Sequence, residues 1–486
     1  MAYKLRSYQE ECVKSISSHI NSDRNDPVLV IGPVGCGKSL LIAEAARLMG
    51  DKTLVLQPSK ELLQQNYDKL TSYGIPATIY SASCGKKELS NMIYATLGSV
   101  KKVIGQLKEM GIRNVLIDEA HAGYSPEDGS EFMTFMNELK PKKVIGFTAT
   151  PCRLKTMSIG QVSYSQLNFI TRMRPVYFKN LIHVIQVEEM IRQGFWTPLK
   201  YETWDFNGDA LKLNSNGSEY TAESISEAVR KNGLNNLILR RLMVLKDVCR
   251  SILVFMDSVE SCNTAAEWMN AKICAGMAEV VHGGTPKRQR EAIVERFKSG
   301  GTQVVFNYSA LGTGFDHPGL DCVVFGRPTF SFSTWYQAIG RAVRIKDGKD
   351  SAMVVDCCDN SSRFGDIRGL SIENYKGYGW GMFIGDKLIT NIPMGDKVTK
   401  TDLDIKAAKK DRRRGLAQGV TAAPIPGRPP HPLGSTVMAF GKYSGWMLHS
   451  IPVSYFKFIN ETFDWDNNRN KEIKEYIDFL IKNNRL

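Results

Sequence analysis

Short apolar runs rich in β-branched residues alternate with longer segments of mixed polarity in the first third of the chain. The runs have the length of buried strands, and the segments between them have the length of helices. Strands and helices that alternate in this way are typical of a parallel sheet wrapped by helices. We therefore expect an α/β lobe over residues 1–155, with strands at 28–31, 53–57, 115–117 and 144–147.

A second set of apolar runs follows the same alternation and predicts a second parallel-sheet lobe over residues 236–365. Two lobes also suit the length, because 486 residues are too many for one ordinary domain. The expected strands of the second lobe are 251–256, 278–281, 303–307, 321–325 and 352–355.

The stretch between the lobes, residues 156–235, has weaker periodicity and a turn-rich segment at Asn214–Gly217. It is expected to be a connector or an insertion. Phe195 and Trp196 in this stretch could stack on bases, but aromatic pairs more often fill a core, and we favour the core.

After the second lobe, residues 366–435 are expected to form a basic and proline-rich linker region. Arg412–Arg414 ends a basic run, and Pro424–Pro432 contains too many prolines for a helix or a central strand. A small C-terminal module is expected over residues 436–486. Its core would be filled by Tyr455, Phe456 and Phe458.

The chain is basic: it contains 63 Lys and Arg residues and 50 Asp and Glu residues, which gives a net charge of +13. Such an excess commonly accompanies phosphate-backbone partners, although many basic proteins bind no nucleic acid. The ten cysteines include no C-x-x-C pair, which argues against a zinc site or a disulfide framework. No basic and apolar leader opens the chain, and no apolar run approaches the roughly 18 residues that span a bilayer. We expect a cytoplasmic protein with reduced thiols and no membrane partner.

The segment Gly32–Ser39 matches the phosphate-loop pattern G-x-x-x-x-G-K-[ST]. It follows an apolar run and opens a helical segment, which is the context that the pattern requires. Glycines let backbone N–H groups face phosphates, the lysine would contact the β- and γ-phosphates, and the serine hydroxyl would bind Mg²⁺. A glycine-rich turn without a ligand is the alternative. The segment predicts an ATP site that includes Gly32, Gly35, Gly37, Lys38 and Ser39.

Two carboxylates, Asp118 and Glu119, follow the apolar run Val115–Ile117. The carboxyl ends of strands are where open α/β sheets bind their ligands. Asp118 therefore suits Mg²⁺ coordination, and Glu119 suits polarising the attacking water. A solvated acidic pair is the alternative when these residues are taken alone, and the phosphate loop about 80 residues upstream favours the catalytic interpretation.

The tetrapeptide Asp118–His121 resembles motif II of superfamily 2 helicases, and other segments resemble further motifs of that family in the family's order. The resemblance spans roughly residues 4–360. It implies two RecA-like lobes with the ATP site in the cleft between them. The other matching segments are Tyr8–Gln9 before the phosphate loop, Pro58–Leu62 (motif Ia), Thr96–Ser99, Thr148–Thr150 (motif III), Leu253–Phe255 (motif IV), Leu311–Asp316 (motif V) and Gln337–Arg344 (motif VI).

The segment that resembles motif VI also has physical support. Gln337, Gly340, Arg341 and Arg344 recur at three- and four-residue spacing, so they are expected to share one helix face. An arginine directed at the γ-phosphate from across a cleft stabilises charge in the transition state. We therefore expect Gln337, Arg341 and Arg344 to act in catalysis; a merely solvated basic helix is the alternative.

The resemblance implies roles for further residues. Gln9 would read the adenine, and Gly314 and Asp316 would belong to the nucleotide site. His121 would link motif II to the second lobe, unless it is a capped surface histidine. Contacts to a nucleic-acid backbone are implied for Lys60, Thr96, Ser99 and Ser309.

Within superfamily 2, the chain looks most like the branch-migration DNA helicase of T5-type phages and RadD-type bacterial DNA repair helicases. The segments that carry this likeness are the DEAH tetrapeptide and Arg327–Tyr336, and Phe440–Gly445 in the C-terminal module strengthens the phage comparison. The chain lacks the cysteine-rich zinc region of RadD-type proteins, which disfavours RadD itself. If the protein is phage-encoded, the expected location is the host cytoplasm.

These observations predict an ATP-dependent DNA helicase or translocase that unwinds or branch-migrates forked and four-way DNA in recombination or repair. Its cofactors would be ATP and Mg²⁺. An RNA helicase, or a DNA-tracking motor subunit for a nuclease without unwinding activity, are the alternatives. The C-terminal module would contact DNA or dock a protein partner.

Overall fold

The computed structural model describes residues 4–127, 129–159, 162–215, 217–310, 317–376, 378–407, 433, 436, 438, 447–462, 465 and 470–483. The chain divides into two compact units. One comprises Met1–Tyr375 and Gly379–Thr399, and the other comprises Lys376–Tyr378 and Lys400–Leu486. The first unit contains both of the expected lobes.

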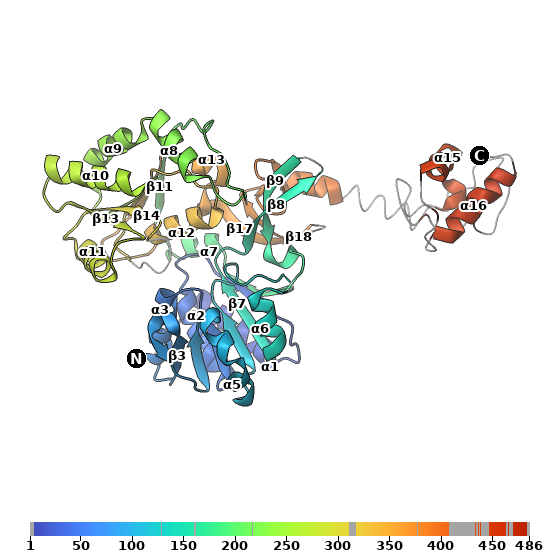
Figure 1. Cartoon of the computed structure of the whole chain (residues 1–486), viewed down its shortest axis with the longest axis horizontal. Coiled ribbons are helices and arrows are strands. Elements are labelled where there is room, and N and C mark those ends of the chain that lie inside the picture. Colours follow the sequence, from blue (N-terminus) through green and yellow to red (C-terminus); the bar gives the residue numbers. More distant parts are fainter. Residues whose placement is uncertain are drawn as a thin grey trace. The chain divides into compact units, whose positions relative to one another are not determined.

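The first lobe is built on a sheet whose strands pair in parallel, except for one short antiparallel pair at its edge. The central strands are short and fully buried, as expected for Val-, Ile- and Leu-rich strands flanked by helices (Figure 1). The order is β10 (Asn180–Val184), β1 (Val28–Ile31), β7 (Lys143–Thr148), β6 (Asn114–Ile117), β2 (Thr53–Leu56), β5 (Met92–Ala95), β3 (Thr78–Ser81) and β4 (Lys86–Lys87). The helices are α1 (Ser7–Asn21), α2 (Lys38–Met49), α3 (Lys60–Thr71), α4 (Leu97–Val100), α5 (Ile104–Glu109) and α6 (Glu131–Leu139).

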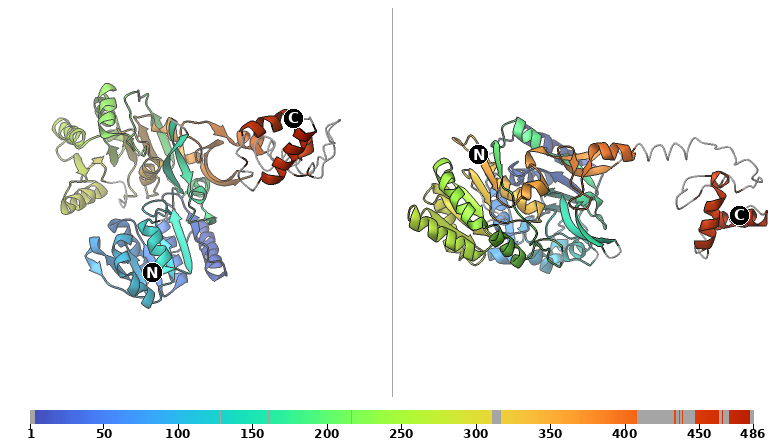
Figure 2. Two further views of the ribbon diagram at one scale, coloured as in Figure 1. Left: turned by 45° about the vertical axis from the view of Figure 1, so that its right-hand side comes forward. Right: turned by 90° about the horizontal axis from the view of Figure 1, so that it is seen from above.

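The second lobe is built on an all-parallel sheet. Its order is β11 (Leu199–Thr203), β16 (Ala352–Asp356), β15 (Cys322–Phe325), β12 (Ile252–Phe255), β14 (Val304–Tyr308) and β13 (Ala278–His282). The helices are α8 (Ala222–Lys231), α9 (Leu234–Val248), α10 (Val259–Lys272), α11 (Lys287–Ser299), α12 (Phe332–Ala342) and α13 (Asn360–Phe364). The α/β fold with two parallel-sheet lobes is thus confirmed, and Figure 2 shows both lobes from two other directions.

The stretch between the lobes differs from the connector that we expected over residues 156–235. Strand β10 joins the first sheet beside β1, and β11 joins the second sheet beside β16. Helix α8 packs into the core of the second lobe through Ile225 and Val229. The sequence did not indicate these two strands, because β10 and β11 are short, half-buried edge strands whose composition gives a weak periodic signal.

A long hairpin precedes β10, formed by β8 (Cys152–Ile159) and β9 (Val162–Phe169). It lies beside a small antiparallel sheet of β17 (Leu370–Tyr375), β18 (Gly379–Ile384), β19 (Lys387–Leu388) and β20 (Val398–Thr399), as Figure 1 shows. Helix α7 (Val187–Arg192) packs on β17. Residues 370–399, which we expected to be linker, are therefore structured. The basic run to Arg414 and Pro424–Pro432 lie outside the described residues.

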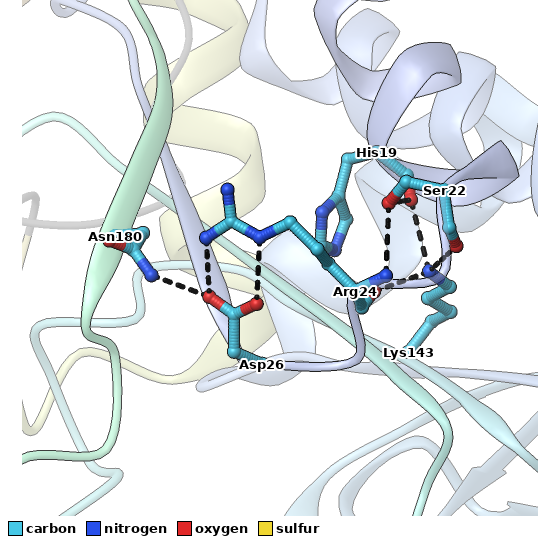
Figure 3. A network of polar contacts seen from close by, with 6 residues as sticks. All are labelled: His19, Ser22, Arg24, Asp26, Lys143 and Asn180. Atoms are coloured by element: carbon cyan, nitrogen blue, oxygen red, sulfur yellow. Dashed lines mark hydrogen bonds and ion pairs between the residues drawn. The ribbon is translucent and has the colours of Figure 1, made fainter.

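The end of α1 is anchored to the first sheet by a buried lysine at the start of β7. Lys143 Nζ donates to the carbonyl oxygens of His19, Ser22 and Arg24 at 3.0, 2.7 and 2.5 Å (Figure 3). In the same loop, Asp26 accepts hydrogen bonds from Arg24 and from Asn180 of β10. Carbonyls at a helix end lack partners within the helix, so the ammonium fixes the helix to the strand.

The second unit contains α15 (Val453–Thr462) and α16 (Lys471–Lys482). Phe456 and Tyr476 are fully buried between them, as a core requires. Phe458, which we expected in this core, is 58% exposed, because a residue two positions after Phe456 lies on the opposite side of the helix. The segment Phe440–Gly445 lies outside the described residues. Among the described helices, none is both long and apolar enough to cross a membrane.

Candidate nucleotide site between the two lobes

The phosphate loop connects β1 to α2, and its glycines adopt conformations that side chains disfavour. Gly35 and Gly37 have φ of 81° and 80°, in the left-handed region. Gly32 is tightly packed instead, since a Cβ there would lie 2.6 Å from Cys36 Sγ. Gly37 caps α2, so Lys38 is the first helical residue, and the helix N-terminus favours an anion at the loop.

A cavity of about 470 Å³ opens at this loop and is lined by both lobes. The first lobe contributes the phosphate loop and the carboxylates after β6, and the second lobe contributes α12 and the residues that follow it. Of the residues expected from the sequence, those that line it are Gln9, Gly35, Gly37, Lys38, Ser39, Asp118, Glu119, Gln337, Arg341 and Arg344.

Lys38 and Glu119 form an ion pair inside the cavity, with 3.8 Å between Nζ and Oε1. Burial alone would lower the pKa of Lys38, but Glu119, Cys36 and Asp118 together outweigh burial and raise it. Burial would likewise raise the pKa of Glu119, but Lys38, His121 and Arg341 lower it to about 2. Both side chains are therefore charged at neutral pH, and the lysine is available to an incoming phosphate.

Asp118 is buried and is held by α3. Its Oδ2 accepts a hydrogen bond from Asn66 Nδ2 at 2.8 Å, and its Oδ1 accepts from the backbone N–H of Glu119. Burial and the charge of Glu119 raise the pKa of Asp118 to about 7. The buried Asp118, the partly buried Glu119 and Ser39 line the same cavity and together offer the oxygen ligands that Mg²⁺ prefers. The residues present therefore fit a magnesium ion.

His121 connects this site to the neighbouring strand and to the second lobe. Its Nδ1 lies 2.8 Å from Thr148 Oγ1 and 3.3 Å from Glu119 Oε2. Its Nε2 lies 3.4 Å from the hydroxyl of Ser333 on α12. The backbone N–H of Thr150 donates to Thr148 Oγ1 at 3.0 Å. One imidazole thus touches Glu119, the Thr148–Thr150 segment and the second lobe.

The arginines come from the carboxyl-terminal end of α12, which packs tightly on the phosphate loop. A Cβ on Gly340 would lie 2.5 Å from Val34, so only glycine fits this contact. Arg341 is buried, and burial lowers its pKa to about 10 although Glu119 opposes this shift. Arg344 lies beyond the last helical residue, Ala342. The expected single helix face is therefore interrupted, yet Arg344 still lines the cavity.

Gln9 lies at the start of α1, where both ends of its side chain are fixed. Nε2 donates to the carbonyl of Cys36 at 2.9 Å, and Oε1 accepts from the backbone N–H of Arg6 at 3.0 Å. The hydroxyl of Tyr8 donates to the same Cys36 carbonyl at 3.1 Å. These bonds hold the beginning of the chain against the phosphate loop.

The remaining expected residues lie elsewhere. Gly32 supports the loop without lining the cavity, and Gly314 and Asp316 lie outside the described residues. The positions expected to contact nucleic acid follow the carboxyl ends of β2, β5 and β14, apart from this cavity. Lys60 begins α3, Thr96 precedes α4 and bonds to Ser99 at 3.1 Å, and Ser309 has a left-handed φ of 53°.

Four basic or polar residues of the cavity wall were not expected from the sequence. Gln65 and Lys69 extend from α3, four residues apart and on the same face as Leu62, a spacing that could have indicated them. Lys4 and Arg6 flank the segment around Gln9, where no separate pattern marks them.

Two family models match the chain and together cover more than half of it. Residues 2–153 match the model described as type III restriction enzyme, res subunit, and residues 235–346 match the helicase conserved C-terminal domain. The two matched segments correspond to the two lobes.

Curated relatives are similar at low identity. IRC3 of Saccharomyces cerevisiae, which carries an assignment as an ATP-dependent helicase, is 24% identical over 74% of this chain and 52% of its own length. A 51.5 kDa protein of a Lactococcus phage is 24% identical over 68% of this chain and 65% of its length. The ATP-dependent DNA helicase Q-like 2 of Arabidopsis thaliana is 23% identical over 72% of this chain and 46% of its own length. The chain thus spans about half to two thirds of the length of these relatives.

Solved structures share the fold. The ATP-dependent type ISP restriction-modification enzyme LlaBIII bound to DNA superposes with a TM-score of 0.55 at 17% identity, over 74% of this chain and 28% of that one. A fragment assigned as an HsdR subunit of a type I restriction enzyme from Vibrio vulnificus YJ016 superposes with a TM-score of 0.54 at 18% identity. The match covers 75% of this chain and 66% of that one. At these identities the likeness establishes the fold of the two lobes.

Proposed function

Because the chain belongs to the ATP-hydrolysing helicases of superfamily 2, we propose that it is an ATP-dependent DNA helicase or translocase of recombination or repair. Its substrates would be forked and four-way DNA, which it unwinds or branch-migrates. The observation that carries the proposal is the cavity in which the phosphate loop of one lobe meets two arginines of the other.

In this proposal the first lobe binds the nucleotide. Lys38 exchanges its contact with Glu119 for the β- and γ-phosphates, and the glycines of the loop and the N-terminus of α2 accept the phosphate charge. Gln9 reads the adenine from its fixed position beside Cys36. Ser39 and Asp118 would hold Mg²⁺, which lowers the negative charge on the phosphates when it is bound.

The reacting water is activated from the same side. Glu119 is ionised and has φ of 45°, a left-handed conformation that residues other than glycine adopt at a cost. This backbone geometry directs its carboxylate toward Lys38 within the cavity. Once Lys38 contacts phosphate, the freed carboxylate can orient the attacking water and accept its proton.

The second lobe completes the site. Arg341 remains protonated at neutral pH because its pKa of about 10 is well above 7, and Arg344 lines the same wall. Both can stabilise charge that develops on the γ-phosphate, and Gln337 from the same helix can hydrogen-bond the water or the phosphate. Hydrolysis would then weaken the attraction between the lobes, and alternate closing and opening would drive movement along a strand.

DNA as the track is supported by the charge of the chain and by its relatives. The net charge of +13 suits a phosphate backbone, and the Arabidopsis relative is named a DNA helicase. Lys60, Thr96, Ser99 and Ser309 would contact the backbone, because all four follow the carboxyl ends of sheet strands. The proposal of a phage branch-migration helicase rests on the motif resemblance and on the similarity to a Lactococcus phage protein.

A second candidate is a DNA-tracking motor of a nuclease, without unwinding. It is favoured by the match to a restriction-enzyme subunit model and by the structural similarity to restriction enzymes. An RNA helicase is the third candidate. Its support is the Yarrowia lipolytica relative named as the RNA helicase PRP28, 24% identical over 62% of this chain.

The test compares ATPase rates and strand separation on single-stranded DNA, duplex DNA, a four-way junction and RNA. The proposal predicts stimulation by DNA together with unwinding of the junction, and no hydrolysis by Lys38→Ala. Stimulation by duplex DNA without strand separation would favour the nuclease motor, and stimulation by RNA alone would overturn the DNA assignment.

A further inference from the structure

The carboxyl-terminal end of α12 is held by a lysine from the following loop. Lys349 Nζ donates to the carbonyl oxygens of Ala342 at 2.6 Å, Arg344 at 2.9 Å and Pro318 at 3.1 Å. The side chain is half-buried at this position. A single ammonium therefore ties the arginine segment to the residues that follow the segment resembling motif V.

A second group of donors reaches the same helix end from the chain before β11. The backbone N–H of Thr197 donates to the carbonyl of Val343 at 2.7 Å, and its hydroxyl donates to that of Arg344 at 2.8 Å. The neighbouring Trp196 donates its indole N–H to the Val34 carbonyl in the phosphate loop at 2.9 Å. The end of the arginine helix and the phosphate loop are thus fixed by adjacent residues.

All three carbonyls from 342 to 344 therefore accept hydrogen bonds from groups outside the helix. Many helices end in a glycine that turns the chain so that later backbone N–H groups satisfy these carbonyls, and here Val343 and Arg344 stand at those positions. A cation at the carboxyl end is also favoured by the helix dipole. Lys349 thus performs the function of a cap without introducing a flexible residue next to Arg344.

We propose that Lys349 is a positioning residue for ATP turnover, which holds the backbone of Arg344 and the end of α12 so that both arginines face the nucleotide cavity. The inference rests on the proposed ATP hydrolysis at this cavity. Lys349 does not line the cavity itself, so its effect is expected on turnover and not on nucleotide affinity.

The electrostatic surroundings of Lys349 make this role dependent on pH. Burial lowers the pKa of Lys349 to about 8; Asp321 opposes the shift, and Arg344 and Lys346 reinforce it. Lys349 in turn contributes to the lowered pKa of His317. Below about pH 8 the ammonium has three N–H groups for three carbonyls. Above this pH the neutral amine has two, so one of the three carbonyls loses its bond to Lys349 and the arginine segment is held less firmly.

The first measurement separates kcat from KM in the full chain with single-stranded DNA at pH 7. Lys349→Met should lower kcat at least about tenfold, because arginine placement stabilises the transition state, while KM for ATP and the affinity for ADP stay within about twofold. Lys346→Met, an exposed cation close by, should match the wild type. Equal kcat in Lys349→Met and the wild type, or a parallel loss of ADP binding, would overturn the proposal.

The second measurement uses pH and needs only well-folded protein. Wild-type kcat should fall as the pH rises from 7 to 9.5, whereas Lys349→Arg, which stays protonated, should retain its rate. The same alkaline decline in both proteins, or Lys349→Arg as inactive as Lys349→Met, would overturn the role of the charge. A wild-type protein without ATPase activity would instead contradict the proposed function, so the two failures are distinguishable.

Discussion

Glu119 combines an unusual backbone with an unusual charge environment. Its left-handed φ is stabilised by Asp118, whose carboxylate accepts the Glu119 N–H, and by the ion pair with Lys38. Strain of this kind persists where the surroundings over-determine the conformation, commonly at functional sites. The backbone conformation and the charged neighbours of Glu119 therefore mark it as a candidate catalytic residue, whereas its burial alone would not.

Glu119→Gln should lower ATP turnover by about 10² or more, because the amide keeps the shape but cannot accept a proton from water. ATP affinity should remain, since Lys38 and the loop glycines are intact. Steady-state rates and direct nucleotide binding check this. Glu127→Gln, on the exposed part of the same loop, is the control. Loss of binding and turnover in equal measure would contradict the role.

His317 predicts a pH-dependent stability. It is buried, lies 2.8 Å from Ser251 Oγ, and burial and Lys346 lower its pKa to about 4. Between about pH 6.5 and 4 the unfolded chain binds a proton that the folded chain rejects, so stability is full above 6.5 and falls with decreasing pH. The slope from one such group reaches about 1.4 kcal/mol per pH unit.

Denaturant unfolding at pH 7 and pH 5 tests this. His317→Gln should lose less stability over this interval than the wild type does. Burial also lowers the pKa values of His19 and His183. Both proteins contain these two histidines, so the difference between the proteins reports on His317 alone. An identical pH dependence in the two proteins would show that His317 titrates normally.

At the scale of elements, lysines fix two helix ends. Lys143 anchors α1 as Lys349 anchors α12, each with three carbonyl acceptors. Burial lowers the pKa of Lys143 too. Lys143→Met would remove the ammonium from these carbonyls in a buried site. Each buried carbonyl left without a hydrogen bond lowers the free energy of unfolding by about 1–3 kcal/mol.

The first lobe of Lys143→Met should therefore unfold at lower denaturant concentration, as followed by circular dichroism or by proteolysis of α1. Lys142→Met is the matched control, because Lys142 is exposed and surface changes usually stay within about 0.5 kcal/mol. Equal stability of the two variants would mean that water replaces the lysine.

Local patterns predicted the elements that local spacing determines. The phosphate loop, the central strands and the acidic pair after β6 follow from a few consecutive residues. The sequence could not place β10 beside β1, because that pairing joins residues about 150 positions apart. In addition, apolar and polar residues alternate only weakly along the half-buried β10. The sequence also predicted a helix that continues to Arg344. The helix ends at Ala342 instead, where Thr197 and Lys349, which lie outside the helix, supply the hydrogen-bond donors.

At the scale of the whole molecule, the second unit has its own core. The proline-rich linker that the sequence predicts would raise the effective concentration of this unit near DNA bound by the proposed motor. Deleting residues 424–486 should leave ATPase stimulation by single-stranded DNA within about twofold but weaken binding to four-way junctions several-fold. Gel-shift titrations of both proteins check this. Junction binding equal to that of the full chain would instead favour a protein-docking role.

The return of β10 to the edge beside β1 limits how the protein can be divided. A fragment that stops at residue 155 would leave one side of β1 without its neighbour, exposing unpaired N–H and C=O groups along a fully apolar strand. Such an edge pairs readily with other chains and promotes aggregation. A soluble, nucleotide-binding fragment should therefore extend through Val184, and a cut within the preceding hairpin should leave two pieces that remain associated through this strand.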